Sequence, residues 1–377
     1  MAAGGTAGHV VPAMAVAAEL RASGAAVSFV GARGRIEAEL VPAAGYEIDL
    51  LDVRGIDRRN PLRAAVAVGK AAVGVRAARG VLRRRRADAV MGGGGYVAGV
   101  AGMAAVLTRT PLVLTEADSH LGLANRALAR RARRVCLSFP IEGREGDPYL
   151  LTGRPVPTAV LGADRDMARR RFGVPDGAHC LLVMGGSQGA RSINLAAVEA
   201  FAESERAASR GFHVIHLSGD RDRDEIARRL AAAPHAERYE LIAYEPHLGD
   251  VLAACDLVLA RSGGSIFEVV ARGRPAILVP YPHATADHQS ANARWMVDAG
   301  AAETIADAEL SARTLAERVG ALLGDPDRLG AMAAASAALA TPDAARRIAD
   351  EVLTVAGPTV PSGAPFTGYD HKRRTGA

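Results

Sequence analysis

The amino-acid sequence predicts an α/β protein with two similar domains, each built around a parallel sheet. Short apolar runs alternate with longer stretches of helical spacing along most of the 377 residues. A glycine-rich turn opens a helical stretch in each half, at residues 4–8 and 185–189. The length of the chain suits two domains of ordinary size. Together these features favour two Rossmann-like domains, each with a glycine turn after its first strand.

Nine short apolar runs are predicted as strands. In the first half they cover residues 26–30, 89–91, 112–114 and 135–137, and in the second half residues 180–184, 213–217, 240–242, 257–259 and 276–279. Two prolines within residues 153–157 discourage regular structure, so the break between the domains is expected there. This gives one domain at residues 1–157 and a second at residues 158–341.

The two ends of the chain carry separate expectations. Only three residues precede the first glycine turn, whereas a central strand needs about five. The sequence therefore predicts either a start further upstream or a shortened central strand, and we favour the upstream start. Residues 357–377 are rich in proline, glycine, serine and threonine, and they are predicted to be a disordered tail.

Composition excludes several classes of protein. Hydrophobic residues make up 49% and charged residues 23%, which excludes a mainly disordered chain. No apolar run approaches the roughly 20 residues of a membrane-spanning helix, and no secretory signal is expected at the start. The three cysteines, Cys136, Cys180 and Cys255, are too few and too scattered for a disulfide framework or a zinc site. A reducing, cytoplasmic setting is expected.

Positive charge is concentrated in the first half. Residues 1–157 hold 22 basic and 13 acidic residues, whereas the remainder holds 24 and 28. Residues 58–86 alone hold ten cations and no acid, together with the apolar residues Leu62, Val66, Val73, Val81 and Leu82. Such a helix can lie on an anionic membrane surface, or it can be a solvated helix that packs its apolar stripe on its own domain. No aromatic residue interleaves with the cations, which argues against nucleic acid.

The two glycine turns are candidate phosphate sites. Glycines at a strand-to-helix junction let the backbone approach a phosphate, and the helix N-terminus offers free N–H groups. Thr6 and Ser187 add one hydroxyl to each turn, but neither turn fits the dinucleotide or P-loop pattern. His9 follows the first turn, where the helix N-terminus disfavours a protonated imidazole. It is a candidate base, and the alternative is a capping or core histidine.

Further polar residues follow predicted strands, at the sheet edge where ligands bind in open α/β folds. Glu116 and Asp118 follow residues 112–114 and can supply a base, or instead cap the next helix. Glu268 lies just after the glycines that follow residues 257–259, where it can accept hydrogen bonds from ribose hydroxyls. Adjacent polar residues can read sugar hydroxyls or form a solvated loop; these are His283, His288, Gln289 and Asn292.

Several separated motifs, in the same order, resemble the MurG family of N-acetylglucosamine transferases. They are GGTAGHVVPAMAVAAEL, VPAAGYEID, GGGGYVAG, GLANRALAR, GGSQGARSIN, PHATADHQSANA and AGAAE, and the resemblance runs from residue 4 to about residue 355. It implies the GT-B fold, in which two Rossmann-like domains face a cleft. It also implies that a helix at residues 342–356 crosses back to the first domain.

The resemblance implies an inverting transfer of N-acetylglucosamine from UDP-N-acetylglucosamine. The acceptor is the C4 hydroxyl of N-acetylmuramyl-pentapeptide linked to undecaprenyl diphosphate, and the product, lipid II, serves peptidoglycan synthesis. The implied location is the cytoplasmic face of the cell membrane, with peripheral attachment to its anionic surface and no nucleic-acid partner. No cofactor is implied, and a divalent metal is not obligatory.

The resemblance also assigns roles by position. His9 is the implied general base, with Glu116 assisting. Residues of the first domain near the acceptor and its diphosphate are Thr6, Ala7, Gly8, Tyr96 and Asp118. Residues implied to hold the nucleotide are Ser187, Gly263, Gly264, Ser265 and Glu268, and those implied to contact N-acetylglucosamine are His288, Gln289 and Asn292.

Four positions depart from the family pattern. Ala7 replaces a glycine, so a positive φ at this position would carry a backbone cost. Asp118 replaces an asparagine and adds negative charge near the diphosphate. Pro157 stands where many members have an arginine that reaches the donor, and Arg154 is placed to substitute for it. The loop at residues 261–268 is one residue shorter than the common form. These departures keep three alternatives open: another lipid or natural-product acceptor, a UDP-N-acetylglucosamine epimerase, and a non-catalytic paralogue.

Overall fold

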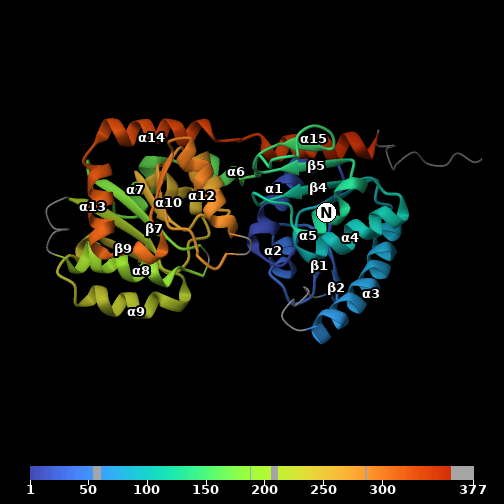
Figure 1. Cartoon of the computed structure of the whole chain (residues 1–377), viewed down its shortest axis with the longest axis horizontal. Coiled ribbons are helices and arrows are strands. Elements are labelled where there is room, and N and C mark those ends of the chain that lie inside the picture. The colour runs from blue at the N-terminus through green and yellow to red at the C-terminus, as the bar shows by residue number, and fades with distance from the viewer. Residues whose placement is uncertain (54–60, 187, 205–210, 285–286, 358–377) are drawn as a thin grey trace, which may run out of the picture.

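The computed structural model of the chain describes residues 1–53, 61–186, 188–204, 211–284 and 287–357. It has two lobes side by side, each with helices on both faces of a parallel sheet (Figure 1). The predicted fold class is confirmed. Of the predicted tail at residues 357–377, all but Gly357 lies outside the described residues, as do Ser187 and the side chains of Leu62 and Val66.

The second domain contains a six-stranded parallel sheet in the order β12-β11-β10-β7-β8-β9. Its strands are β7 (His179–Met184), β8 (Phe212–Leu217), β9 (Tyr239–Ile242), β10 (Leu257–Ala260), β11 (Ala276–Leu278) and β12 (Ala302–Thr304). Successive side chains of β7 point to opposite faces of the sheet. Leu182 and Met184 join one buried cluster, and Leu181 and Val183 join another.

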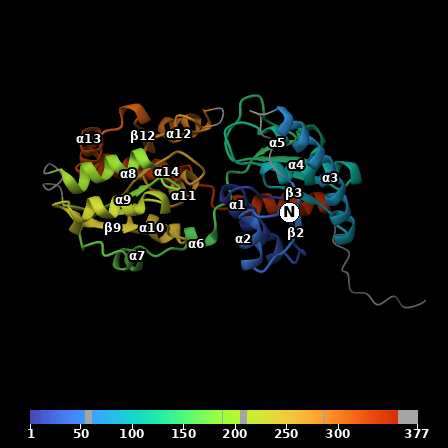
Figure 2. The same ribbon diagram turned by 90° about the horizontal axis from the view of Figure 1, so that it is seen from below.

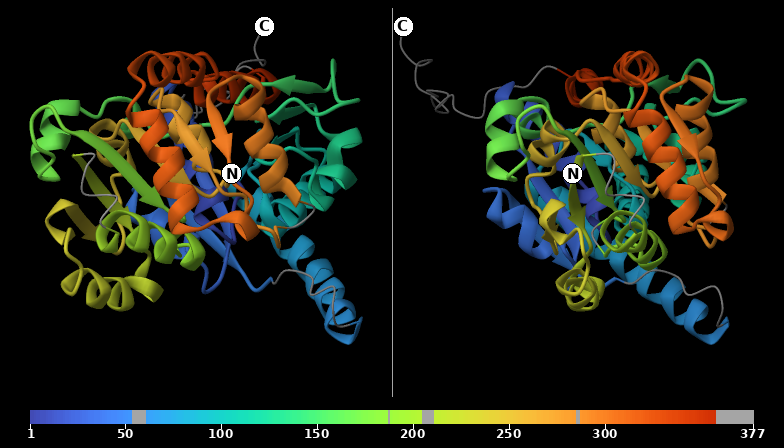
Figure 3. Two further views of the ribbon diagram at one scale, coloured as in Figure 1. Left: turned by 60° about the vertical axis from the view of Figure 1, so that its left-hand side comes forward. Right: turned by 90° about the vertical axis from the view of Figure 1, so that its left-hand side faces the viewer.

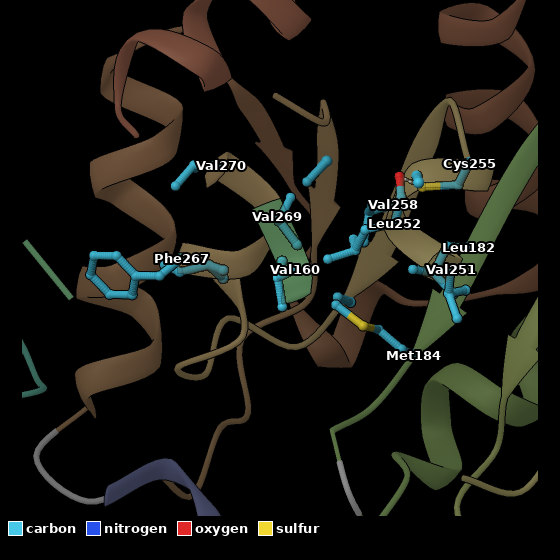
Figure 4. Packing of buried hydrophobic residues seen from close by; sticks show 14 of the residues in the cluster. Val160, Leu182, Met184, Val251, Leu252, Cys255, Val258, Phe267, Val269 and Val270 are labelled. Carbon is cyan, nitrogen blue, oxygen red and sulfur yellow. Dashed lines mark hydrogen bonds between the residues drawn. The ribbon is translucent and has the colours of Figure 1, made fainter. Parts of the chain in front are cut away.

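Each face of this sheet is covered by its own helices. The first cluster packs against α6 (Thr158–Leu161), α7 (Arg165–Arg171), α10 (Leu248–Ala254), α11 (Ile266–Ala271) and α12 (His288–Asp298). Figure 4 shows part of this cluster, with Val160 of α6 and Phe267 of α11. The second cluster packs against α8 (Arg191–Val198), α13 (Ala312–Leu323) and α14 (Pro326–Ala338). Helix α9 (Asp220–Ala231) packs against α8.

The sheet of the first domain consists of two parts that meet at Ala2. One part pairs β1 (Ser28–Ala32) with β2 (Glu47–Leu51). The other runs β3 (Val90–Gly92), β4 (Leu112–Glu116), β5 (Arg134–Leu137) and β6 (Tyr149–Leu151). Ala2 forms parallel bridges to Val30 on one side and to Gly92 on the other. This short extended segment therefore occupies the central position of the sheet.

The C-terminal helix α15 (Ala344–Ala356) packs on the first domain, beside α1 (Ala7–Ala22) (Figure 2). Its buried residues Ala345, Ile348 and Val352 share a cluster with Val10 and other residues of α1. The opposite face of the sheet is covered by α3 (Pro61–Arg85), α4 (Gly95–Thr108) and α5 (Leu123–Leu128), and α2 (Glu37–Ala43) lies beside β1 and β2. The chain thus supplies both its beginning and its end to one domain.

The two domains are also joined by direct packing. Phe139, just after β5, is 2% exposed and lies with its ring centroid 4.6 Å from Phe267 and 5.2 Å from Trp295 of the second domain. Gly153 has a positive φ of 79°, and a Cβ there would overlap the side chain of Thr341. The two segments that connect the domains, one containing Gly153 and the other containing Thr341, therefore pack against each other.

Both sheets have a point where the strand order reverses, and ligands bind beyond the carboxyl ends of strands at such points. In the second sheet this point lies at β7, between β8 and β10. In the first sheet it lies at Ala2, between β1 and β3. The glycine turns that follow these segments are the ones that the sequence singled out.

Three strands were missed by the prediction: β2, β6 and β12. In strand β2, Glu47 and Asp49 interrupt the apolar residues Ile48, Leu50 and Leu51, and these acids pair with Arg85 and Arg84 of α3. Strands β6 and β12 have three residues each and lie at sheet edges. Strand β1 also begins two residues later than predicted and continues to Ala32, whose N–H donates to the carboxylate of Glu37.

Helix α3 accounts for most of the basic stretch at residues 58–86, and its first turns project beyond the body of the domain (Figure 3). Val81 and Leu82 are buried in the domain core, as the packing alternative predicts, whereas the Val73 side chain is 69% exposed. Within the described part of the chain, no helix is both long enough and apolar enough to cross a membrane.

Candidate active site

The first glycine turn leads directly into α1. Gly5 has a φ of +95°, a conformation that glycine adopts without strain. Thr6 occupies the N-cap position, and Ala7 is already the first residue of the helix. Ala7 is therefore not among the residues with positive φ. The expected backbone cost of alanine in place of glycine does not arise here, which is a correction to the sequence-based expectation.

His9 lies in a pocket formed by the tetraglycine turn after β3. A Cβ on Gly94 would sit 2.5 Å from Cδ2 of His9, so only glycine leaves room for the ring. The Thr6 hydroxyl lies 3.3 Å from Nδ1. Burial lowers the pKa of His9, and the charge of Arg154 lowers it further, while Asp118 and Glu37 oppose that shift. The imidazole is therefore neutral near pH 7 and able to accept a proton.

Glu37 of α2 supports the first glycine turn, a role that the sequence analysis did not predict. Its side chain is fully buried in α2, with Oε2 accepting from the N–H of Gly5 at 3.1 Å and Oε1 accepting from the N–H of Ala32 at 3.0 Å. A carboxylate that accepts backbone N–H groups is held in place by strong, charge-assisted bonds. Glu37 therefore fixes the glycine turn that precedes His9.

Glu116 organises the loop after β4. Its two oxygens accept hydrogen bonds from the N–H groups of Ala117, Asp118 and Gly122, and from the side-chain amide of Asn125. Burial raises the pKa of Glu116, and these hydrogen bonds oppose the shift. With both oxygens occupied, Glu116 holds the loop that leads into α5, although no described side chain caps the first turn of that helix. Its role as an assisting base stays a prediction.

Tyr96 lies at the other side of the first turn. Its ring is 3.7 Å from the position of a Cβ on Gly5, and its hydroxyl is buried without a hydrogen-bond partner among the described residues. A buried hydroxyl without a partner carries an energetic cost that a ligand can relieve. This placement is compatible with the predicted contact to the acceptor.

In the second domain, the loop after β10 is fastened to the start of α12. The Ser262 hydroxyl donates to the backbone oxygen of Gln289 at 2.7 Å, and the amide of Asn292 donates to the backbone oxygen of Ser262 at 3.1 Å. Oε1 of Gln289 accepts from the N–H of Tyr281 at 2.9 Å. Asn292 is only 1% exposed, and its amide nitrogen holds this loop, while its Oδ1 is buried without a hydrogen-bond partner among the described residues. Its contact with the sugar stays a prediction.

A cavity of about 560 Å³ lies between the domains. Its walls combine residues of both glycine turns with the loop after β10, and they include Ala7, Gly8, Gly185, Gly263, Gly264 and Ser265. Glu268 and Gln289 also line it. Burial raises the pKa of Glu268 to about 7, although the charge of Arg154 opposes that shift. The His288 ring lies outside this set, with its centroid 6.5 Å from that of His120 in the first domain.

Of the fifteen predicted positions, seven line this interdomain cavity: Ala7, Gly8, Gly263, Gly264, Ser265, Glu268 and Gln289. Among the residues it describes, no group of three or more metal-ligating side chains is present. Two supporting residues, Glu37 and Arg154, hold the first glycine turn and the domain junction. The sequence predicts for Arg154 only that it can substitute for the arginine that Pro157 replaces, and it predicts no role for Glu37.

Comparison with known proteins identifies related chains. Residues 1–137 match the glycosyltransferase family 28 N-terminal domain, and residues 180–348 match its C-terminal domain. The UDP-N-acetylglucosamine--N-acetylmuramyl-(pentapeptide) pyrophosphoryl-undecaprenol N-acetylglucosamine transferase of Moorella thermoacetica is 39% identical, over 96% of this chain and 98% of the relative. The protein of the same name from Mycolicibacterium paratuberculosis is 39% identical, over 94% of this chain and 88% of the relative.

Solved structures agree with this. The crystal structure of Acinetobacter baumannii MurG is similar with a TM-score of 0.74 and 28% identity, covering 93% of this chain and 98% of that chain. The calicheamicin glycosyltransferase CalG4, at 20% identity and a TM-score of 0.69, shares the fold. The arrangement is the GT-B fold of two Rossmann-like domains. By full-length similarity in sequence and structure, the chain belongs to the MurG family of glycosyltransferases.

Proposed function

We propose that this enzyme transfers N-acetylglucosamine from UDP-N-acetylglucosamine to the C4 hydroxyl of lipid-linked N-acetylmuramyl-pentapeptide. The observation that carries the proposal is a half-buried, neutral imidazole directly after Ala7 and Gly8, which line a cavity that both domains share. His9 belongs to the first domain, and the loops that match the nucleotide-binding positions belong to the second. A cleft of this kind brings two substrates together in one site.

In this mechanism the donor lies mainly against the second domain. His9 removes the proton from the acceptor hydroxyl, the oxygen attacks C1 of the sugar from the face opposite the diphosphate, and the configuration inverts. The glycine turn before α8 and the free N–H groups of that helix stabilise the charge that develops on UDP. The proposal needs no obligatory metal, because the N-terminus of α8 supplies this stabilisation. Thr6, Gly8 and Tyr96 contact the acceptor side, and Glu268 binds the ribose.

The first domain is also proposed to dock on the cytoplasmic face of the membrane, where a lipid-linked acceptor is held. Val73 of α3 and Leu107 of α4 are 69% and 52% exposed. Arg83, Arg86 and Arg109 line an open depression between the ends of these helices. Exposed apolar side chains among cations suit a peripheral attachment to anionic lipid. Sedimentation with vesicles tests this: binding should need anionic lipid and weaken in high salt.

The transfer is tested with UDP-N-acetylglucosamine and lipid-linked muramyl-pentapeptide, with other UDP-sugars as controls. We expect a disaccharide product with N-acetylglucosamine as the preferred sugar. His9→Gln should lose at least about 100-fold in turnover while keeping the donor affinity of the wild type. Near-normal turnover of His9→Gln would refute the assignment of the base. Formation of N-acetylmannosamine from the donor alone would instead identify an epimerase.

A further inference from the structure

Arg154 occupies the junction between the domains, in the segment that joins β6 to α6. The residue is only 7% exposed. Its guanidinium lies 5.8 Å from the ring of Phe267 in the second domain, and a Cβ on Gly264 would sit 2.6 Å from Nη2. On the other side, the guanidinium donates to backbone oxygens of the first domain, from Nη2 to Gly8 at 2.5 Å and from Nη1 to Ala117 at 3.4 Å.

The bond to Gly8 has its origin in the sequence of α1. Residue 12 of this helix is a proline, which has no N–H to donate to the carbonyl four residues earlier. The oxygen of Gly8 is thus left without its helical partner, and Arg154 supplies a donor to it. This places the cation against the residue that immediately precedes His9, so the position of Arg154 is built into the fold.

Arg154 is also a cation without an ion pair. Among the described residues, no carboxylate oxygen lies within 4.0 Å of its guanidinium, although Glu268, Asp118 and Glu116 act on it from further away. The other arginine that lines the cavity, Arg261, is held by Asp307 at 2.6 Å. A buried cation is expensive unless an anion compensates it. The cavity therefore offers an anionic ligand one arginine that no carboxylate contacts directly.

We propose that Arg154 receives the diphosphate of the donor and, through its position beside Gly8, makes proton removal by His9 depend on donor binding. The proposal rests on the proposed transfer and adds a positioning residue to it. While the donor is absent, the charge of Arg154 opposes protonation of His9, and Asp118 and Glu37 partly offset that effect. When the diphosphate neutralises Arg154, His9 becomes a stronger base, at the moment when the reactive sugar is in place.

The first test is the affinity for UDP, measured by calorimetry with no acceptor present. Arg154→Gln should weaken UDP binding by about 30-fold or more, as expected when a buried charged contact is removed. Arg154→Lys keeps the charge but loses the planar, two-pronged geometry, and it should fall between. The control is Arg313→Gln, which removes an arginine that is 79% exposed on α13 and should bind UDP like the wild type.

The second test is the titration of His9, followed by NMR with labelled histidine and assigned by the signal that His9→Gln lacks. We expect the midpoint to lie at higher pH in Arg154→Gln than in the wild type, to stay close to the wild type in Arg154→Lys, and to rise in the wild type when UDP is added. A wild type that transfers sugar, paired with an Arg154→Gln variant of unchanged UDP affinity and unchanged His9 midpoint, would overturn the inference and leave the proposed function intact. Failure of the wild type to bind UDP would overturn both.

Discussion

Replacing Glu37 with glutamine should destabilise the glycine turn that precedes His9, although Glu37 itself contacts no substrate in the proposed mechanism. The carboxylate accepts the N–H groups of Gly5 and Ala32 in a fully buried position. In Glu37→Gln one of these N–H groups faces an amide nitrogen that cannot accept it, and the other loses the charge on its acceptor. An unsatisfied buried donor costs about 1–3 kcal/mol, and a hydrogen bond to a charged group contributes about 1.5–3 kcal/mol. We therefore expect a loss of about 3 kcal/mol in the free energy of unfolding.

The assay must report on the first domain. Circular dichroism during urea denaturation follows the helices and strands of both domains, whereas the single tryptophan, Trp295, lies in the second domain and meets the first at Phe139. Turnover should fall by about 100-fold, because a shift of about 1 Å in the turn displaces His9. Glu39→Gln is the matched control, since Glu39 lies exposed on the same helix and should change stability by less than about 0.5 kcal/mol. Equal stability and turnover in the two variants would refute the role of Glu37.

Three further outcomes are expected. Gly94→Ala should lower turnover at least about 10-fold, because the new methyl group displaces the His9 ring. Gly143 also has a positive φ but no neighbouring atom within 4 Å of a Cβ, so Gly143→Ala should lower stability through backbone strain and leave turnover unchanged. Equal turnover in the two variants would contradict the steric argument. Because the pKa of Glu268 is raised to about 7, its carboxylate forms as pH rises from 6 to 8, so donor affinity measured by calorimetry should rise over that range, and Glu268→Gln should abolish the rise. Glu116→Gln should lower the melting temperature together with turnover, because four donors lose their charged acceptor; a loss of turnover alone would instead support the role of an assisting base.

The architecture was predictable because its signals are local. Apolar runs of a few residues mark buried strands, and glycine turns mark the points where helices begin. Strand β2 carried a weaker signal, because Glu47 and Asp49 interrupt its apolar residues and face the arginines of α3. These arginines lie about 35 residues away in sequence, so a search for short apolar runs cannot detect the pairing.

The site was predictable only in part, for a related reason. His9 and Glu268 follow glycine turns, so their positions are visible along the chain. Glu37 supports the site by accepting a hydrogen bond from the N–H of Gly5, which lies 32 residues earlier, and only the folded structure brings the two together. Asn292 was predicted from its polar neighbours to contact the sugar, and the hydrogen bond from its amide to the carbonyl of Ser262 is a contact that no local pattern reveals. Burial decides between such roles, and burial depends on tertiary structure.

Helix α15 has a consequence for how this protein is made. Ala345, Ile348 and Val352 complete a buried cluster with α1, although more than 320 residues separate the two helices. During synthesis the first domain therefore emerges with one apolar face uncovered, and that face stays exposed until the second domain has been translated. Contacts this distant in sequence slow folding and prolong exposure to aggregation. A chain that stops after α14 should accordingly harm the domain translated first, and leave the second domain closer to intact.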